Sequence, residues 1–514
     1  MVRRALLASS AVVGLAAGVS VAASAAAAPD GSTVQASERA VRIAAAQPNV
    51  VGTPHMIIHQ RDKGTAPGYI FTGPKVDGPR PKGTFVGPMI SDNRGRPIWF
   101  QNYPGQIHAT DVRVQTYRGQ KVLTYWLGRS APDNPGVGVG TDLILNSHYQ
   151  VIKRVHSHGR EAADQHEFQI TKRGTAIVVS YQVRTMNAKA EGGARQQKVY
   201  DCVVQEVNLR TGKLAFVWHS AVHVPLSDSF VPPPKDATTG KPLANTPWDY
   251  FHINSVNIDR DGNVIISSRH TFSVYKVNYK TDKTMWTLGG KASTFKLGPG
   301  VAFSWQHNAV PLGHNTYRIF DNNWSRIPPK PKNKVSRVLW IKVHPNTKTA
   351  NLVRKALIHP SGKVLAGSQG NAQTLGKGHV FVGWGDADRI SEFNAKGKML
   401  FNAQFPAHPA KDLFINTYRA YRFPWVGMPT GHPTLHRSSP NGHEQFDVVW
   451  NGATRVVKWR INGGSGPRKL HLLGTTRWRG LDTAFRLSRA PAYVQVTAVD
   501  GRGHILARTG VVRS

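Results

Sequence analysis

Residues 252–268 read HINSVNIDRDGNVIISS: a short strand, a polar turn and a second, β-branched strand. This pattern is typical of a β-hairpin, because Asp and Gly allow a tight turn while Val and Ile favour extended backbone. The same arrangement recurs at residues 166–180, 307–320 and 370–382 and, more loosely, at 108–125. Self-similarity of this kind indicates a fold made of repeated units.

A second hairpin follows most of these units. Examples are residues 206–218, 276–286 and 392–401, where a polar turn separates two runs that favour strands. Two hairpins make a four-stranded antiparallel sheet, and such sheets packed in a ring form a β-propeller, which leaves few free strand edges. Residues 83–425 show no sustained helical periodicity. The sequence therefore predicts an all-β fold based on a propeller.

The number of units predicts six blades over residues 55–435. Five units follow from the repeats, and residues 418–424 offer the first strand of a sixth. Its outer strands are expected from residues 88–100, an outer hairpin without a partner in its own part of the chain. The two ends of the propeller segment would then close the ring together.

The pattern changes from about residue 440. Short alternating strands such as residues 456–461 and 493–499 predict a small β-sandwich over residues 440–514. Its tryptophans and its closing strand loosely resemble a fibronectin type III module. Residues 29–54 are expected to form a linker.

Residues 1–28 are predicted to be a cleaved signal peptide. Arg3 and Arg4 precede an apolar run that ends in small residues, with cleavage expected near residues 25–28. No other stretch is long and apolar enough for a transmembrane helix. We therefore expect a secreted or cell-envelope protein. The route, by the general or the twin-arginine pathway, stays open.

The composition is strongly basic, with 66 Lys and Arg against 29 Asp and Glu, a formal net charge of +37. Such a field attracts anionic substrates and polymers, so anionic cell-wall polymers are candidate partners. Nucleic acid is not expected, because the chain has neither a dense basic tail nor a recognition-helix pattern. The single cysteine, Cys202, excludes an intramolecular disulfide and any metal site built on several thiolates.

Histidine opens four of the repeat units. Because the first strand of each propeller blade lines the central channel, one ring is expected to contain His108, His166, His252 and His307. The fifth unit has Gly370 at this position. One histidine on a strand is usually structural, whereas four at one repeat position indicate a functional ring.

Metal binding, acid–base catalysis and nucleophilic catalysis all use clustered imidazoles. Asn254 lies two residues after His252, so its amide points the same way along the strand. Arg269 ends the partner strand and offers an oxyanion a planar pair of donors. Asn308 follows His307. No carboxylate recurs among the opening positions, so the pocket is expected to suit a sulfuryl or phosphoryl group better than a metal, and no metal site is predicted.

Four linked motifs resemble the bacterial arylsulfate sulfotransferase family. They are FHINSV at residues 251–256, SRH at 268–270, MWTLGG at 285–290 and FSWQHNA at 303–309. The resemblance extends over roughly residues 55–430. It implies an exported β-propeller that moves sulfate from a phenolic sulfate ester to a phenol, with no nucleotide sulfate donor and no cofactor.

The resemblance also implies roles for individual residues. His307 would become transiently sulfated in a ping-pong reaction, and His252, Asn254 and Arg269 would hold the sulfuryl oxygens. His166 would protonate or orient the phenolic oxygen. His108 and Asn308, from the same ring, are predicted to bind substrate.

This chain departs from the best-known family members, which carry an extra N-terminal domain and a disulfide. Dimerisation and disulfide-assisted folding are therefore not transferred. Two other hypotheses stay open at this point. The chain could be a non-catalytic basic propeller that binds anionic ligands or cell-wall polymers, or a metal-dependent propeller hydrolase or lyase.

Overall fold

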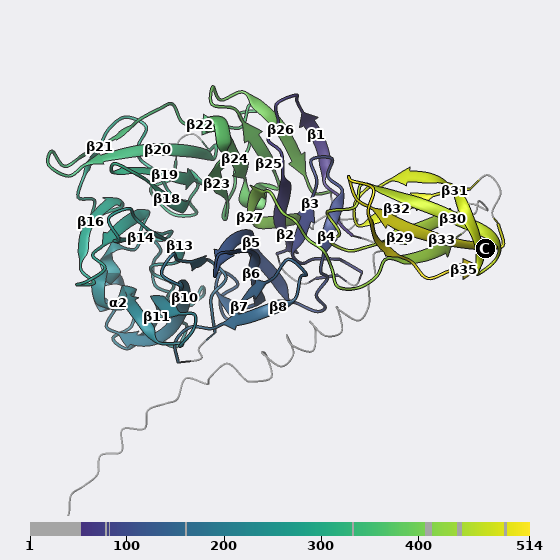
Figure 1. Cartoon of the computed structure of the whole chain (residues 1–514). Coiled ribbons are helices and arrows are strands. Elements are labelled where there is room, and N and C mark those ends of the chain that lie inside the picture. Colours follow the sequence, from purple (N-terminus) through teal and green to yellow (C-terminus); the bar gives the residue numbers. More distant parts are fainter. Residues whose placement is uncertain are drawn as a thin grey trace, which may run out of the picture.

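Small antiparallel sheets arranged around a common centre make up most of the molecule, as the computed structural model shows (Figure 1). The structure describes residues 53–77, 80–81, 83–159, 162–331, 334–406, 414–438, 445–487 and 491–513. The predicted signal peptide and all but the last two residues of the predicted linker lie outside the described residues. Within those ranges, no helix has the length and apolarity needed to cross a membrane.

Three sheets form the first half of the ring, and their strands run in order from the centre outwards. The first contains β27 (Ile415–Phe423), β2 (Tyr69–Val76), β3 (Met89–Ser91) and β4 (Pro97–Phe100). The second contains β5 (His108–Tyr117), β6 (Gln120–Ser130), β7 (Gly138–Leu145) and β8 (Val151–Val155). The third contains β9 (Phe168–Ile170), β10 (Thr175–Met186), β11 (Gln197–Asn208) and β12 (Leu214–His219).

Three further sheets complete the ring. The fourth contains β13 (Ile253–Ile258), β14 (Val264–Ser268), β15 (Ser273–Val277) and β16 (Thr284–Gly289). The fifth contains β18 (His307–Gly313), β19 (Thr316–Asp321), β20 (Arg337–His344) and β21 (Thr349–Leu352), with the short β17 (Lys296–Leu297) and β22 (Leu357–Ile358). The sixth contains β23 (Asn371–Thr374), β24 (Val380–Gly383), β25 (Ile390–Phe393), β26 (Met399–Gln404) and β1 (Ile57–Arg61).

Both ends of the propeller segment close the ring. The late strand β27 pairs with the early strand β2, with Tyr421 opposite Phe71. This is the predicted union of residues 418–424 with the hairpin at 88–100. The early strand β1 also pairs with β26 at the outer edge of the sixth sheet, with Ile57 opposite Gln404. The sequence did not predict this fifth strand.

The core lies between neighbouring sheets, so inner strands are buried on both faces. Strands β14 and β15 are buried at every position. Between the third and fourth sheets, Ile177, Val204, Trp218, Phe251 and Val256 belong to one apolar cluster. This two-sided burial explains why these strands read as continuous β-branched runs. The all-β prediction is confirmed, since the only helical segments described are single turns, α2 (Ser220–His223), η1 (Lys189–Glu191), η2 (Leu226–Asp228), η3 (Gly376–Gly378) and η4 (Gly385–Ala387).

The C-terminal strands form two further sheets beside the first propeller sheet (Figure 1). One contains β28 (Thr434–Ser438), β29 (Gln445–Val449) and β32 (Asp482–Phe485). The other contains β31 (Lys469–Arg477), β30 (Lys458–Gly466), β33 (Tyr493–Val499), β34 (Ile505–Arg508) and β35 (Val512–Arg513). The Asn451 amide exchanges two hydrogen bonds with the backbone of Phe100, at 2.8 and 3.0 Å, and thereby joins this unit to the propeller.

Candidate active site

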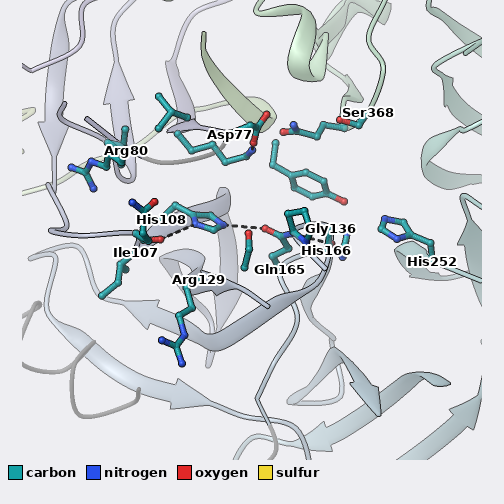
Figure 2. Close-up of a pocket in the computed structure, with 18 of the residues that line it drawn as sticks. Asp77, Arg80, Ile107, His108, Arg129, Gly136, Gln165, His166, His252 and Ser368 are labelled. Carbon is teal, nitrogen blue, oxygen red and sulfur yellow. Dashed lines mark hydrogen bonds and ion pairs between the residues drawn. The ribbon is translucent and has the colours of Figure 1, made fainter. Parts of the chain in front are cut away.

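A cavity of about 590 Å³ lies where the inner strands begin (Figure 2). Consecutive sheets contribute four histidines to its wall, His108, His166, His252 and His307. Arg269 and Tyr418 also line it. The repeat position of the histidines therefore predicted correctly that they share one cavity.

The His307 imidazole is buried at the start of β18, and its two nitrogens have different surroundings. Nδ1 lies 2.7 Å from Oδ1 of Asn322 and 3.0 Å from the backbone oxygen of Trp305. Nε2 accepts a hydrogen bond from the backbone N–H of Gln369, at 3.1 Å. Burial, together with the nearby Arg269 charge, holds the pKa of His307 well below its ordinary value. His307 is therefore a neutral imidazole.

His252 is fixed by a carboxylate. Its Nδ1 donates to Oδ2 of Asp249 at 2.5 Å, and its φ of 54° lies in the left-handed region. Such a backbone costs about 1–3 kcal/mol in a non-glycine residue and is often found at functional sites. Burial and then the Arg269 charge hold the pKa of His252 well below its ordinary value. The imidazole of His270 lies beside it, with ring centroids 4.7 Å apart.

His166 also has a carboxylate behind it, because its Nδ1 donates to Oδ1 of Asp164. Its ring lies edge-on to that of His252, with centroids 5.0 Å apart. The Tyr418 ring lies 5.5 Å from that of His166 and 6.4 Å from that of His307. Tyr418 thus offers an aromatic surface between two of the histidines, where an aryl group can pack.

His108 lies further from this group, towards Arg129 in Figure 2. Its Nε2 is bonded to Oε1 of Gln165 at 3.1 Å, and its ring lies 5.3 Å from that of Trp126. Burial lowers the pKa of His108 to about 4. A neutral imidazole held in this way suits the binding of substrate better than proton transfer.

Arg269 supplies positive charge without a carboxylate partner in the part of the chain that the structure describes. Its guanidinium lies over the Trp305 ring, 4.3 Å from the centroid, and its Nε is buried without a hydrogen-bond partner among the described residues. Burial lowers the pKa of Arg269 to about 10, so the group stays charged near neutrality. A half-buried guanidinium in a cavity wall, with no carboxylate partner among the described residues, is suited to an oxyanion.

Asn254 and Asn308 do not line the cavity. The Asn254 side chain is fully buried and donates to the backbone oxygen of Gln306 at 2.7 Å. The Asn308 side-chain oxygen accepts the backbone N–H of Ala372 at 3.2 Å. A bulged register places Asn254 behind the wall, because the β13–β14 ladder shifts between Ile253 and Ser255.

The expectation of a pocket without carboxylates is wrong. Asp77 lines the cavity beside Lys75, and Asp249 and Asp164 hold two of the histidines. These acids lie in segments outside the aligned opening positions, so the repeat comparison could not reveal them. The wall is still cationic, since against Asp77 it contains Lys75, Arg80, Arg129, Arg269 and Arg326.

Asp249, His252 and His270 are the residues that could hold a metal, since their ligand atoms lie within 4.8 Å of one another. The Arg269 charge adds to burial in lowering the pKa of both histidines, and the same charge repels a divalent cation. Arg269, rather than this cluster, is the group here that attracts an anion.

Several site residues have weak sequence signals. Asp249 and Asp164 precede their histidines by three and two residues, a spacing that is common by chance. Gly136 lies in a Gly-rich run, and a Cβ there would come within 3.1 Å of the His252 ring. Because glycine has no side chain, this loop can pack against the His252 ring and form part of the cavity wall. Asn322 has no local signal, because it reaches His307 from the following strand.

The family model for arylsulfotransferase (ASST) matches residues 113–406, more than half of the chain. This segment contains His166, His252, Arg269 and His307. No curated protein shows significant similarity.

Solved structures resemble the chain only distantly. A protein of unknown function from Bacteroides caccae is 11% identical, with a TM-score of 0.38, over 70% of this chain and all of its own. The Neurospora crassa Pan2 WD40 domain is 9% identical, with a TM-score of 0.33, over 80% of this chain and 90% of its own. A streptogramin B lyase is 8% identical, with a TM-score of 0.29, over 86% of this chain and 94% of its own.

Likenesses at this level carry no information about chemistry. The family match does carry information about chemistry, because it includes three of the four cavity histidines together with Arg269. The chain belongs to the arylsulfotransferase (ASST) family and is an aryl sulfotransferase.

Proposed function

We propose that the cavity transfers the sulfuryl group from an aryl sulfate to a phenol in two steps through sulfated His307. In the first step, the Nε2 lone pair forms a bond to sulfur while the bond between sulfur and the aryl oxygen breaks. The electron pair leaves with the aryl oxygen, which takes a proton. In the second step, the acceptor phenol gives up its proton and its oxygen displaces Nε2 from sulfur.

The neighbouring residues divide the remaining work. Negative charge builds up on the peripheral and leaving oxygens of a loose transition state, as in phosphoryl transfer. The Arg269 guanidinium stabilises this charge, and each well-placed donor of this kind contributes about 3–4 kcal/mol. Carboxylates accept the Nδ1 hydrogens of His166 and His252 and so orient both rings, which pass the proton to and from the aryl oxygens.

The observation that carries the proposal is the buried His307, whose pKa lies well below its ordinary value, in the same cavity wall as Arg269. The test uses a chromogenic aryl sulfate with and without a phenol, comparing the wild type, His307→Ala and the matched control His359→Ala. His359 is similarly buried but lines a different cavity. We expect acceptor-dependent release that only His307→Ala abolishes.

Mass spectrometry after quenching without acceptor should find one sulfuryl group on the peptide that contains His307. Parallel double-reciprocal plots would support two half-reactions. Sulfotransfer that survives in His307→Ala would overturn the proposal, and so would sulfation at another residue.

The proposal extends to location and partners. The apolar segment after Arg3 and Arg4 supports export, and the net charge of +37 supports contact with anionic cell-wall polymers. Terminal sequencing of the mature protein after cell fractionation tests the first point. Salt-dependent sedimentation with purified walls tests the second, with walls stripped of their anionic polymers as the control.

A further inference from the structure

We infer that Asn322 is the positioning residue of His307: its side-chain oxygen holds the imidazole proton on Nδ1 and thereby leaves the Nε2 lone pair for the sulfuryl group. This inference rests on the proposed transfer through His307. It concerns a residue at the end of the fifth sheet that lines no part of the cavity.

The orientation of the Asn322 amide follows from its own hydrogen bonds. Its Nδ2 donates to the backbone oxygens of Ala366 and Gln369, at 3.2 and 3.0 Å. Its Oδ1 therefore faces Nδ1 of His307, at 2.7 Å. The second neighbour of Nδ1 is the backbone oxygen of Trp305, which can only accept. With acceptors on both sides, Nδ1 must carry the hydrogen.

The other end of the ring requires the same tautomer independently. The backbone N–H of Gln369 points at Nε2 from 3.1 Å, and a donor there needs a lone pair on that nitrogen. Gln369 holds this position with a left-handed φ of 66°. When sulfur bonds to Nε2, this N–H loses its acceptor and lies next to the oxygens of the transferred group.

His307 differs from His252 and His166 in the side chain that is hydrogen-bonded to its Nδ1. Asp249 and Asp164 place a carboxylate on Nδ1 of His252 and of His166. Asn322 places a neutral amide on His307. Burial and the Arg269 charge hold the pKa of this ring well below its ordinary value, and they outweigh the Asn322 hydrogen bond, which raises it. The titratable and charged groups that face His307 are Arg269, His252, His166 and Tyr418.

The neutral partner also affects the second step. Sulfation at Nε2 with the proton kept on Nδ1 leaves a positive charge on the ring. An amide oxygen compensates this charge only weakly, so the bond between nitrogen and sulfur breaks readily when phenol oxygen attacks. A carboxylate in place of the Asn322 amide would stabilise the charged ring and lengthen the life of the intermediate.

The experiment compares Asn322→Asp, Asn322→Ala and the control Asn371→Ala. The Asn371 amide is fully buried and makes two 2.9 Å hydrogen bonds to the backbone of Ala420, and among the described residues its side chain has no hydrogen bond to a histidine. Loss of a residue that orients a reactive imidazole typically costs about 10-fold to 100-fold in rate. We expect kcat to fall by this amount in both Asn322 variants, with little change in KM.

The pH profile distinguishes positioning from a structural role. In Asn322→Asp the added carboxylate should move the acidic limb of kcat/KM to higher pH, and the sulfated enzyme should persist longer after rapid mixing without acceptor. Asn371→Ala should lower stability but leave the profile unchanged. An unchanged profile in a folded Asn322→Asp variant would overturn the inference.

A second measurement keeps the inference testable without any Asn322 variant, because the carboxylate of Asn322→Asp would face two backbone oxygens and could prevent folding. Nitrogen NMR of ¹⁵N-histidine-labelled wild type, with His307 assigned by its loss in His307→Ala, reports the tautomer without substrate. Protonated Nδ1 with unprotonated Nε2 is expected, and the reverse tautomer refutes the inference even if sulfated His307 is found. Absence of sulfated His307 in the wild type refutes the proposed function instead.

Discussion

Replacing Arg269 by methionine should stabilise the folded protein and remove its activity. The guanidinium lies half-buried against Trp305, and its pKa of about 10 is lower than the ordinary 12.5 because burial disfavours the charge. Near neutrality this group is charged in both the folded and the unfolded chain, so the whole cost of burying the charge is present. A tenfold change corresponds to about 1.4 kcal/mol, which makes this cost about 3 kcal/mol.

The contact with the Trp305 ring offsets part of this cost, since such contacts contribute about 0.5–2 kcal/mol. Methionine fills a similar volume without charge, so unfolding should become harder by about 1–3 kcal/mol. For a chain of this size, that corresponds to a rise in melting temperature of about 1–3 °C. The loss of the oxyanion donor should lower kcat by about 100-fold to 1,000-fold.

Calorimetry and aryl sulfate turnover measure the two effects on the same samples. Arg269→Lys keeps the charge but loses the planar donor pair, so its rate should lie between those of the wild type and the methionine variant. Arg337→Met is the contrasting control, because Arg337 pairs at 2.8 Å with the buried Asp321. Its removal should destabilise by about 3–5 kcal/mol. A lower melting temperature for Arg269→Met, or unchanged turnover, would refute the reasoning.

Two further predictions concern stability. Burial lowers the pKa of His108 to about 4 and that of His270 to about 3, so below pH 6.5 the unfolded chain binds protons that the folded chain does not. The free energy of unfolding should therefore fall between about pH 6.5 and 4, by about 3 kcal/mol for each of these histidines at pH 4. Melting temperatures measured over this range should fall less steeply for His108→Gln than for the wild type. Gly73→Ala should lower the free energy of unfolding by about 1–3 kcal/mol, because its Cβ would lie 2.3 Å from the backbone oxygen of Ala109 in the neighbouring sheet. An unchanged denaturation midpoint would contradict this prediction.

Much of the fold could be predicted because strand and turn preferences are local. The runs at residues 166–180 and 252–268 form hairpins in the structure, as their β-branched residues and polar turns indicate. The sequence also predicted that residues 418–424 and the hairpin at 88–100 share one sheet, but it did not predict that strand β2 lies between them and pairs with β27. The pairing of β1 with β26 was missed, because five residues of alternating burial at an edge carry a weak signal.

The candidate site was predictable where it follows the repeat. His108, His166, His252 and His307 share a cavity because they hold equivalent places at the starts of inner strands. Asn254 shows the limit of this argument. Alternation along a strand predicts its direction, but a shift in the ladder turns its amide to Gln306.

The sequence by itself determined the all-β class, the repeated sheets and the four histidines that line one cavity. These properties depend on local backbone preference and on position within a repeat. Only the tertiary structure decided which partner each imidazole has: Asp249 for His252, Asp164 for His166 and Asn322 for His307. Those partners come from loops and strand ends whose places depend on the packing of whole sheets, and they fix the orientation of each imidazole in the cavity.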